Sequence, residues 1–404
     1  MKSSGGDASD DGPKQTQRLI KLGIAVVAAL ILYGVGSSMF GDLLSGTRRS
    51  KLTGDCNEIS KAIERWELDN KKPFLEWEID RLVGTTLGNA VRDPDGRPYL
   101  YDWFFRRFVY LGPDGLLQTL VPGKTTEPGE SDDEVRPLAA IDRLVYARAE
   151  GAATAIELAN ADGSNPKQLA LVTSPVLDVS GLPTKDANLV ALTLSTTSGT
   201  QLAVVDIAAS PAVVNPLTRG DHHDACPALS GVKTEWIFYQ SDMDAKSPDK
   251  THVYKISYKD KSPARMTAGD GGFGQPAVEL RTHWVWYTAD NALWRFQLSN
   301  YGEPQRRLSG KPYRSPAPSA SGDFLAYLVA DTLEVIDTRS NKVVFTAASV
   351  VPDSRICWSP DDSKIGYLVS QDGQQRMVLS HVAKNVTFTV PGAVTGRGFA
   401  WLHD

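Results

Sequence analysis

Short apolar strands alternate with polar turns through the C-terminal two thirds of the chain. The run Pro316–Leu328 joins a short strand, a Ser-Gly-Asp turn and a second apolar strand, and Ile356–Leu368 repeats this order. Further copies begin at Pro227 and Pro276 and continue into aromatic strands. A repeat of about 40 residues with several strands in each unit is typical of a propeller blade. The pattern therefore predicts a mainly β fold.

About six such units are present, each with the strands and hairpin turns of a four-stranded blade. Their second strands are Leu144–Ala149, Leu189–Leu194, Trp236–Tyr239, Trp284–Tyr287, Phe324–Leu328 and Ile365–Val369. The first unit has no good inner strand before Ile141, whereas Gly398–Leu402 is an inner strand with no second strand behind it. We expect the C-terminal strand to complete the first blade, because closure removes exposed sheet edges. A stack of open β-sandwiches is the alternative, and the regular period disfavours it.

The repeat resembles the TolB-like propeller family, a relative of the WD-repeat propellers. The family's Trp-Ser-Pro-Asp-Gly turn is matched at Trp358–Asp362, with Asp362 in place of glycine, and its second turn is matched at Ser241–Asp244. The resemblance covers residues 138–404 and implies the fold, but it says little about chemistry. The residues that we assign to the repeat turns are Ser230, Ser319, Ser359, Pro360 and Asp361.

The N-terminal residues divide into a polar tail and an apolar stretch. Residues 1–17 have no apolar period and are predicted to be disordered. Residues 18–41 are predicted to form a transmembrane helix, because no charge occurs from Leu22 to Gly41 and about 20 apolar residues cross a bilayer. A cleavable signal peptide is the alternative. The residues that mark the span are Leu22, Ile24, Val27, Leu30, Leu32 and Phe40.

Positive charges flank this stretch about equally, so they do not decide its orientation. A short tail ahead of a single span usually stays in the cytoplasm. We therefore expect a single-pass inner-membrane protein whose C-terminal domain is periplasmic or otherwise extracytoplasmic.

Residues 42–120 are predicted to form a small α+β module. A helix is indicated by an apolar stripe that is spaced four, three, four and three residues apart. The stripe consists of Leu52, Cys56, Ile59, Ile63 and Trp66. A second short helix is expected over Leu75–Val83, and two strands are expected at Tyr99–Tyr101 and Phe108–Leu111. A two-stranded β element would pack on the helix, since neither buries its apolar face alone.

Three turns in residues 19–120 resemble the periplasmic region of the major pseudopilins of type II secretion. They are Asp69–Pro73, Asp93–Tyr99 and Gly112–Gly115. No glutamate occurs between Leu19 and Gly41, where a prepilin carries one. We therefore interpret the module as a stalk that carries the propeller, and not as a filament subunit.

Residues 121–137 are predicted to be an acidic linker. Asp132, Asp133 and Glu134 would supply oxygen ligands to calcium, which the pseudopilin resemblance places near this point. A plain solvated linker is the alternative.

Composition excludes several classes of function. The net charge of −5 carries no nucleic-acid footprint, and three cysteines in 404 residues form neither a disulfide framework nor a zinc cluster. Cys226 and Cys357 fall in inner strands and are expected to be buried free thiols. The chain has no nucleophile elbow, phosphate loop or dinucleotide fingerprint, so no cofactor is predicted.

One stretch holds candidate metal ligands or acid–base groups. Asp221, His222, His223 and Asp224 lie just before an inner strand, where loops open toward the channel of a propeller. Neighbouring residues of an extended stretch point to opposite sides, so all four cannot reach one ion. A polar loop at the channel mouth is the alternative.

These observations favour a membrane-anchored, non-enzymatic platform that binds a protein partner in the cell envelope. The resemblances suggest association with a secretion or pilus-type machinery. The alternative is a propeller hydrolase or carbohydrate-binding protein that uses carboxylates at the channel mouth.

Overall fold

The computed structural model of the chain describes residues 47–112, 114–126, 133–138, 142–182, 188–231, 236–245, 250–270, 272–298 and 303–402. They fall into two compact units. The first comprises the chain up to Trp103 with Phe108–Leu116 and Glu130–Leu138, and the second comprises Phe104–Arg107, Leu117–Gly129 and the chain from Ala139.

The predicted tail and membrane span lie outside the described residues, and so do all the residues that mark the span, from Leu22 to Phe40. Among the helices of the described ranges, none is both long enough and apolar enough to cross a membrane.

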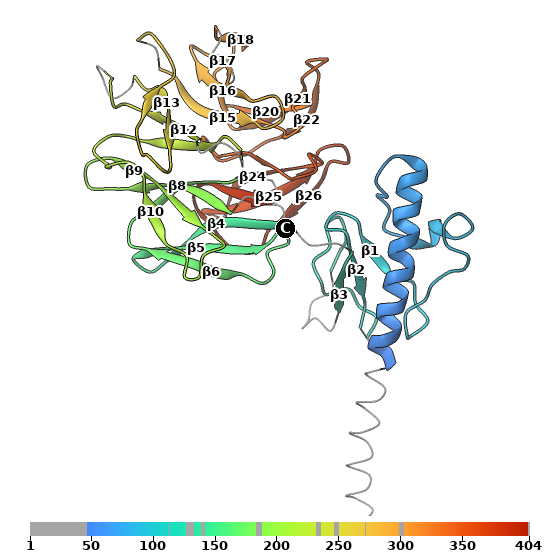
Figure 1. Cartoon of the computed structure of the whole chain (residues 1–404). Coiled ribbons are helices and arrows are strands. Elements are labelled where there is room, and N and C mark those ends of the chain that lie inside the picture. The colour runs from blue at the N-terminus through green and yellow to red at the C-terminus, as the bar shows by residue number, and fades with distance from the viewer. Residues whose placement is uncertain are drawn as a thin grey trace, which may run out of the picture. The chain divides into compact units, whose positions relative to one another are not determined.

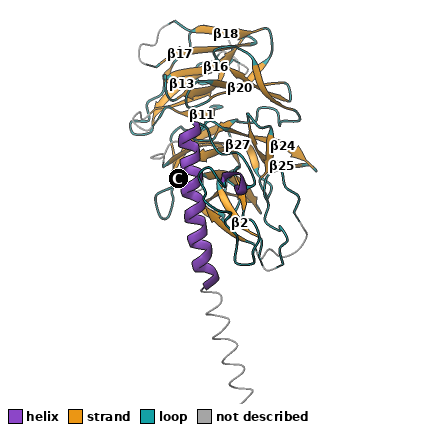
Figure 2. Cartoon of the chain, turned by 90° about the vertical axis from the view of Figure 1, so that its right-hand side faces the viewer, coloured by secondary structure: helices purple, strands orange, loops and turns teal. Residues whose placement is uncertain are grey.

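The first unit contains a helix over residues 47–70, which is the long helix in Figure 2. Its predicted stripe faces inward, because Leu52, Ile59 and Ile63 are buried and Cys56 and Trp66 are half-buried. The second predicted helix is only a 3-10 turn, η1 (Ile79–Leu82). Four residues complete little more than one turn, so the segment does not propagate as an α-helix.

The sheet of this unit has three strands instead of the predicted two. Strands β1 (Leu100–Asp102), β2 (Arg107–Tyr110) and β3 (Glu134–Pro137) are ordered β1-β2-β3. Residues 134–137, which the sequence predicts to belong to the acidic linker, therefore form a strand of this sheet. Their backbone groups fill the open edge of β2, and such pairing needs no apolar side chains.

The second unit consists of six four-stranded antiparallel sheets, or blades. Blade 1 contains β27 (Thr395–Leu402), β4 (Arg143–Glu150), β5 (Ala153–Asn160) and β6 (Lys167–Val172), and blade 2 contains β7 (Val176–Ser180), β8 (Leu189–Ser195), β9 (Thr200–Asp206) and β10 (Val214–Pro216). Blade 3 contains β11 (Ala225–Leu229), β12 (Trp236–Ser241), β13 (His252–Ser257) and β14 (Ala264–Arg265), and blade 4 contains β15 (Gly274–Glu279), β16 (Trp284–Ala289), β17 (Ala292–Gln297) and β18 (Gln305–Ser309). Blade 5 contains β19 (Tyr313–Pro318), β20 (Phe324–Val329), β21 (Thr332–Asp337) and β22 (Val343–Ala347), and blade 6 contains β23 (Cys357–Trp358), β24 (Lys364–Gln371), β25 (Gln374–His381) and β26 (Val386–Thr389).

The ring closes as the sequence predicts. Strand β27 pairs with β4 and places Phe399 opposite Tyr146 and Trp401 opposite Leu144. In Figure 1 the C-terminal end accordingly lies beside the green strands of blade 1. The hydrophobic cores lie between neighbouring blades. One core, for example, joins Ala317 of blade 5 to Trp358 of blade 6.

The predicted turn serines close the connection between the first two strands of their blades. The Ser319 N–H donates to the carbonyl of Phe324 at 2.9 Å, and the Ser319 hydroxyl accepts from the Phe324 N–H at 3.2 Å. Ser359 makes the same pair of bonds with Lys364, at 3.0 and 2.9 Å. Ser230 donates to the carbonyl of Trp236 from its N–H and its hydroxyl. All three serines are buried, so they hold the fold.

The other two assigned turn residues, Pro360 and Asp361, lie in the turn that Ser359 closes. The Ser359 hydroxyl donates to the Asp361 carboxylate at 2.6 Å. Asp361 therefore helps to fix the turn.

Candidate functional site at the channel mouth

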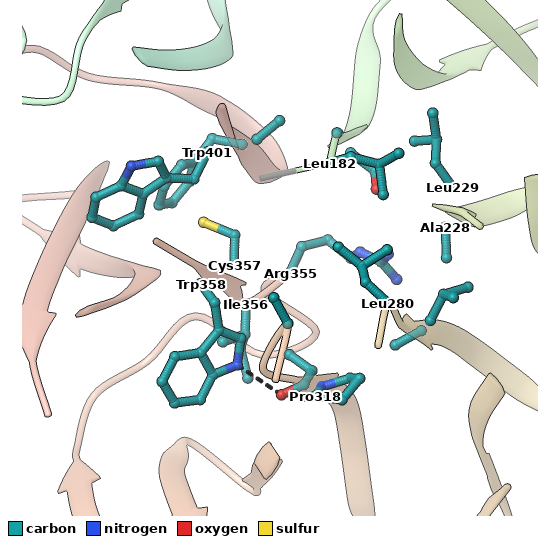
Figure 3. A pocket seen from close by; sticks show the side chains of 18 of the residues that line it. Leu182, Ala228, Leu229, Leu280, Pro318, Arg355, Ile356, Cys357, Trp358 and Trp401 are labelled. Carbon is teal, nitrogen blue, oxygen red and sulfur yellow. Dashed lines mark hydrogen bonds between the residues drawn. The ribbon is translucent and has the colours of Figure 1, made fainter. Parts of the chain in front are cut away.

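The inner strands of all six blades line a narrow central cavity of about 90 Å³. Most of the side chains that line it are apolar, and Figure 3 shows Leu182, Leu229 and Trp401 among them. Trp358 donates from Nε1 to the carbonyl of Ala317 at 2.9 Å, the dashed line in Figure 3. Because a water molecule takes about 30 Å³ of the liquid, this space holds only a few waters. The channel is therefore narrow.

A second, polar cavity of about 440 Å³ opens at one end of the channel, and we call it the mouth. The two cavities meet along the same inner strands. In β11, Cys226 lines the mouth and Ala228 lines the channel. In β15, Gln275 lines the mouth and Ala277 lines the channel. The mouth thus lies where the inner strands begin. Its polar lining includes Gln240, Gln275, Asn291, Arg314, Asp353 and Arg397.

Bulges at the start of three inner strands shape the mouth. The pairing register of β11 with β12 shifts between Ala225 and Ala228, and equivalent shifts occur in β15 and β19. At these bulges Cys226, Gln275 and Ser315 have φ values of 54°, 49° and 46°. A residue in this left-handed region turns its N–H out of the sheet ladder, so the N–H needs another acceptor.

Side chains of the preceding blades supply these acceptors. The Cys226 N–H donates to Oδ2 of Asp178 at 3.2 Å, and the Gln275 N–H donates to Oε1 of Gln240 at 3.1 Å. The Ser315 N–H donates to Oε1 of Gln275 at 2.7 Å. Polar groups at the rim therefore join blade 2 to blade 3, blade 3 to blade 4, and blade 4 to blade 5.

The carboxylates of Asp178 and Asp353 make further contacts between blades at the rim. Arg397 of β27 donates to Oδ2 of Asp178 at 3.0 Å, which joins blade 1 to blade 2. Asp353, just before blade 6, accepts from Nε2 of Gln275 at 3.1 Å and from Arg314 at 3.4 Å. The rim of the mouth is thus fixed by a circle of hydrogen bonds and ion pairs.

Burial and neighbouring charges shift the pKa values of Arg397 and Cys226, which line the mouth. Burial acts to lower the pKa of Arg397, but Asp178, Cys226 and Asp353 together outweigh it and the pKa is raised. Burial raises the pKa of the Cys226 thiol to about 11. At neutral pH the thiol is therefore protonated and is a poor nucleophile or metal ligand.

The predicted loop Asp221–Asp224 does not line either cavity. His223 bonds to Asp242, with 2.8 Å from its Nδ1 to Oδ2 and 2.8 Å from its N–H to Oδ1. The carbonyl of His222 accepts from the Thr200 N–H at 2.8 Å. These contacts tie the loop to blade 2 and to the turn after β12.

Asp221 lies 3.7 Å from Nε2 of His222 at the surface, whereas Asp224 is buried and burial raises its pKa. Within the described ranges, no three His, Cys, Asp or Glu side chains are grouped so that they could hold a metal. Of the calcium candidates, Asp132 lies outside the described residues, and Glu134 accepts from Arg136.

The sequence prediction missed the residues of the mouth. Asp178, Arg314, Asp353 and Arg397 are far apart in the sequence and form no motif. One signal was available, because each of the three bulge residues directly precedes a proline. Proline restricts the backbone conformation of the residue before it, but this restriction does not reveal which side chain of the neighbouring blade accepts from that residue's N–H.

The fold is that of a six-bladed β-propeller of the TolB type. The solved structure of TolB from Acinetobacter baumannii is similar, with a TM-score of 0.55 and 16% identity over 65% of this chain and 67% of that chain. A putative TolB from Agrobacterium tumefaciens has a TM-score of 0.46 at 11% identity, over 64% of this chain and 94% of that chain. A nidogen/laminin complex has a TM-score of 0.49 at 9% identity, over 64% of this chain and 98% of that chain.

No family model matches the sequence, and no curated protein sequence matches it. The likeness to TolB confirms the predicted propeller fold and shows the fold alone. The pseudopilin resemblance of residues 19–120 receives no support from these comparisons.

Proposed function

We propose that this protein is a non-enzymatic binding protein of the cell envelope, and that the mouth of its propeller holds a segment of a protein partner. An apolar N-terminal span anchors it in the inner membrane, and the propeller lies on the periplasmic side. Association with a secretion or pilus-type machinery rests on the pseudopilin resemblance alone.

The observation that carries this proposal is the contrast between the two cavities. The mouth, at about 440 Å³, is large enough to take several side chains and is polar, whereas the channel beneath it measures only about 90 Å³. A partner would therefore insert a loop or an extended segment from one side. The interblade bonds hold the rim in place before binding, which reduces the ordering cost of association.

The geometry does not favour the hydrolase alternative. Glycoside hydrolysis requires two carboxyl groups, one that donates a proton and one that acts as base or nucleophile. Of the two carboxylates that line the mouth among the described residues, Asp353 accepts from Arg314 at 3.4 Å and Asp290 is exposed. One of the two carboxylates is thus already engaged by an arginine, so the mouth does not offer the free pair that this chemistry needs.

The anchoring and orientation are proposed from the uncharged stretch between Leu22 and Gly41. The protein should remain in membranes after a carbonate wash. Protease added to intact spheroplasts should digest the propeller. Protection of the propeller in spheroplasts, with digestion after lysis, would show the opposite orientation.

Site-specific crosslinking tests the binding proposal. A photoreactive amino acid is placed at Asn291, which lines the mouth and is exposed, in the full-length protein in intact cells. The matched control places it at Leu171, which is 54% exposed on the outer strand of blade 1. We expect a defined protein adduct from Asn291 and not from Leu171. If neither position or both positions give the same adducts, the mouth is not the binding surface.

A further inference from the structure

We infer that the segment bound at the mouth presents a carboxylate, and that Arg355, where the central channel adjoins the mouth, receives it. The inference rests on the proposed function, because it assumes that the mouth takes a protein segment. It adds the chemical class of the group that must enter: an acidic side chain or a free chain terminus.

Arg355 lies where the two cavities adjoin. Its side chain lines the central channel, while Asp353 and Arg397 line the mouth. Its N–H donates to the carbonyl of Arg397, which places it beside the closing strand. Figure 3 shows its guanidinium extending across the channel toward Ala228 and Leu280.

The charge of Arg355 has no counter-ion among the described residues. The two arginines that line the mouth are paired: Arg397 with Asp178 at 3.0 Å and Arg314 with Asp353 at 3.4 Å. The Arg355 side chain makes one hydrogen bond, at 2.8 Å, to the carbonyl of Pro227. A guanidinium has five N–H donors, so most of its donors remain available.

A half-buried cation without a counter-ion, among mostly apolar side chains, is unfavourable for stability. A methionine of similar length would fit the same walls without a charge. Such a position is explained if a ligand supplies the missing anion, because a carboxylate pairs with guanidinium in a bidentate manner. The neighbouring Arg397 side chain, 35% exposed, is available to the same ligand.

The first measurement separates a binding role from a structural role. If Arg355 holds the fold, Arg355→Met lowers the melting temperature of the full-length protein. If Arg355 instead serves to bind a carboxylate, Arg355→Met leaves the melting temperature unchanged or raises it. Arg314→Met serves as the matched control, because it removes an arginine that already has a carboxylate partner and should not gain stability.

The second measurement is direct binding to the detergent-extracted full-length protein. The probes are acetylated glycine pentapeptides with a central Asp or a central Asn, each with an amidated end, and an unamidated pentaglycine. Binding of the Asp peptide alone identifies a side-chain carboxylate, and binding of the unamidated peptide identifies a chain terminus. We expect Arg355→Met to weaken binding at least tenfold and Arg355→Lys to restore part of it.

Two results overturn the inference: equal binding of all three peptides, or unchanged binding and unchanged Asn291 adducts in Arg355→Met. The proposed function survives those results, since the adducts still form. It fails separately if wild-type protein gives no mouth-specific adduct.

Discussion

Arg397 and Asp178 are 219 residues apart in sequence, yet Nη2 of the arginine donates to Oδ2 of the aspartate at 3.0 Å. This contact joins the strand that closes the ring to the first strand of blade 2. The aspartate is fully buried and also accepts from the Cys226 N–H, so it links three blades. The backbones approach closely here, since a Cβ on Gly181 would lie 2.7 Å from Cβ of Ala400. The seam of the propeller is therefore held by packing and by one buried carboxylate.

Removal of this carboxylate should destabilise the propeller. Asp178→Ala leaves the Arg397 guanidinium and the Cys226 N–H without their acceptor, and we expect the free energy of unfolding to fall by about 3 kcal/mol. Chemical denaturation of single and double variants with Arg397→Met should give a coupling energy of about 1–2 kcal/mol.

An exposed ion pair supplies the control. Arg339 and Asp323 lie 2.7 Å apart, with side chains 79% and 42% exposed. Asp323→Ala should cost less than about 1 kcal/mol. If Asp178→Ala costs no more than Asp323→Ala, the seam contact does not stabilise the fold.

Ring closure predicts a large effect at the C-terminal strand. Trp401 is 2% exposed in β27, and Trp401→Ala should lower the free energy of unfolding by about 3–5 kcal/mol. Deletion of residues 395–404 should leave blade 1 without its inner strand and give insoluble protein.

The control substitution in the same chain is Leu68→Ala, because Leu68 is 77% exposed. It should change stability by less than about 0.5 kcal/mol. A soluble deletion protein with the wild-type melting temperature would contradict closure by β27.

The blades were predictable because their signals are local. Ser319 and Ser359 occupy equivalent positions in successive units, and each forms hydrogen bonds with a residue only a few positions further along the chain. The mouth was not predictable, because its bonds join residues that only the closed ring brings together. Ser315 carries a positive φ without being glycine, so composition gives no warning of the bulge. Strand β3 was missed since it pairs through its backbone and has little apolar patterning.

His381 should make stability depend on pH. It is 5% exposed, its Nδ1 accepts from the Lys384 N–H at 3.2 Å, and burial together with Lys364 lowers its pKa to about 4. In the unfolded chain the pKa is about 6.5. Between these values the unfolded state binds a proton that the folded state does not, so stability falls as pH falls from about 6.5 to 4, by up to about 3 kcal/mol.

Denaturation midpoints measured from pH 7.5 to 4 test this slope. His381→Asn keeps an acceptor for the Lys384 N–H but does not titrate, so its slope over this range should be smaller by the contribution of one group. His283→Asn, at an exposed position, should keep the wild-type slope. Parallel curves for wild type and His381→Asn would show that His381 does not contribute.

The turn serines should contribute to stability individually. Ser359→Ala removes the hydroxyl that accepts from the Lys364 N–H at 2.9 Å inside the protein, and we expect a loss of about 1–3 kcal/mol. Ser262→Ala, at an exposed turn, should cost less than about 0.5 kcal/mol. Equal losses for the two variants would mean that the repeated serine is not a structural requirement of the blade.

The first unit should unfold when its helix loses its apolar face. Ile63 is fully buried, and the next stripe residue, Trp66, packs edge-on against Phe74 at 5.2 Å, which in turn stacks on Tyr101 of β1 at 6.0 Å. Ile63→Asp would bury a carboxylate without a partner, at a cost of several kcal/mol. Limited proteolysis should then cut the first unit while the propeller keeps its cooperative unfolding transition, because the two units have separate cores. Leu68→Asp, on the exposed face of the same helix, should remain resistant. Loss of the propeller transition in Ile63→Asp would show that the two units fold as one, and resistance equal to that of Leu68→Asp would show that the stripe is not packed.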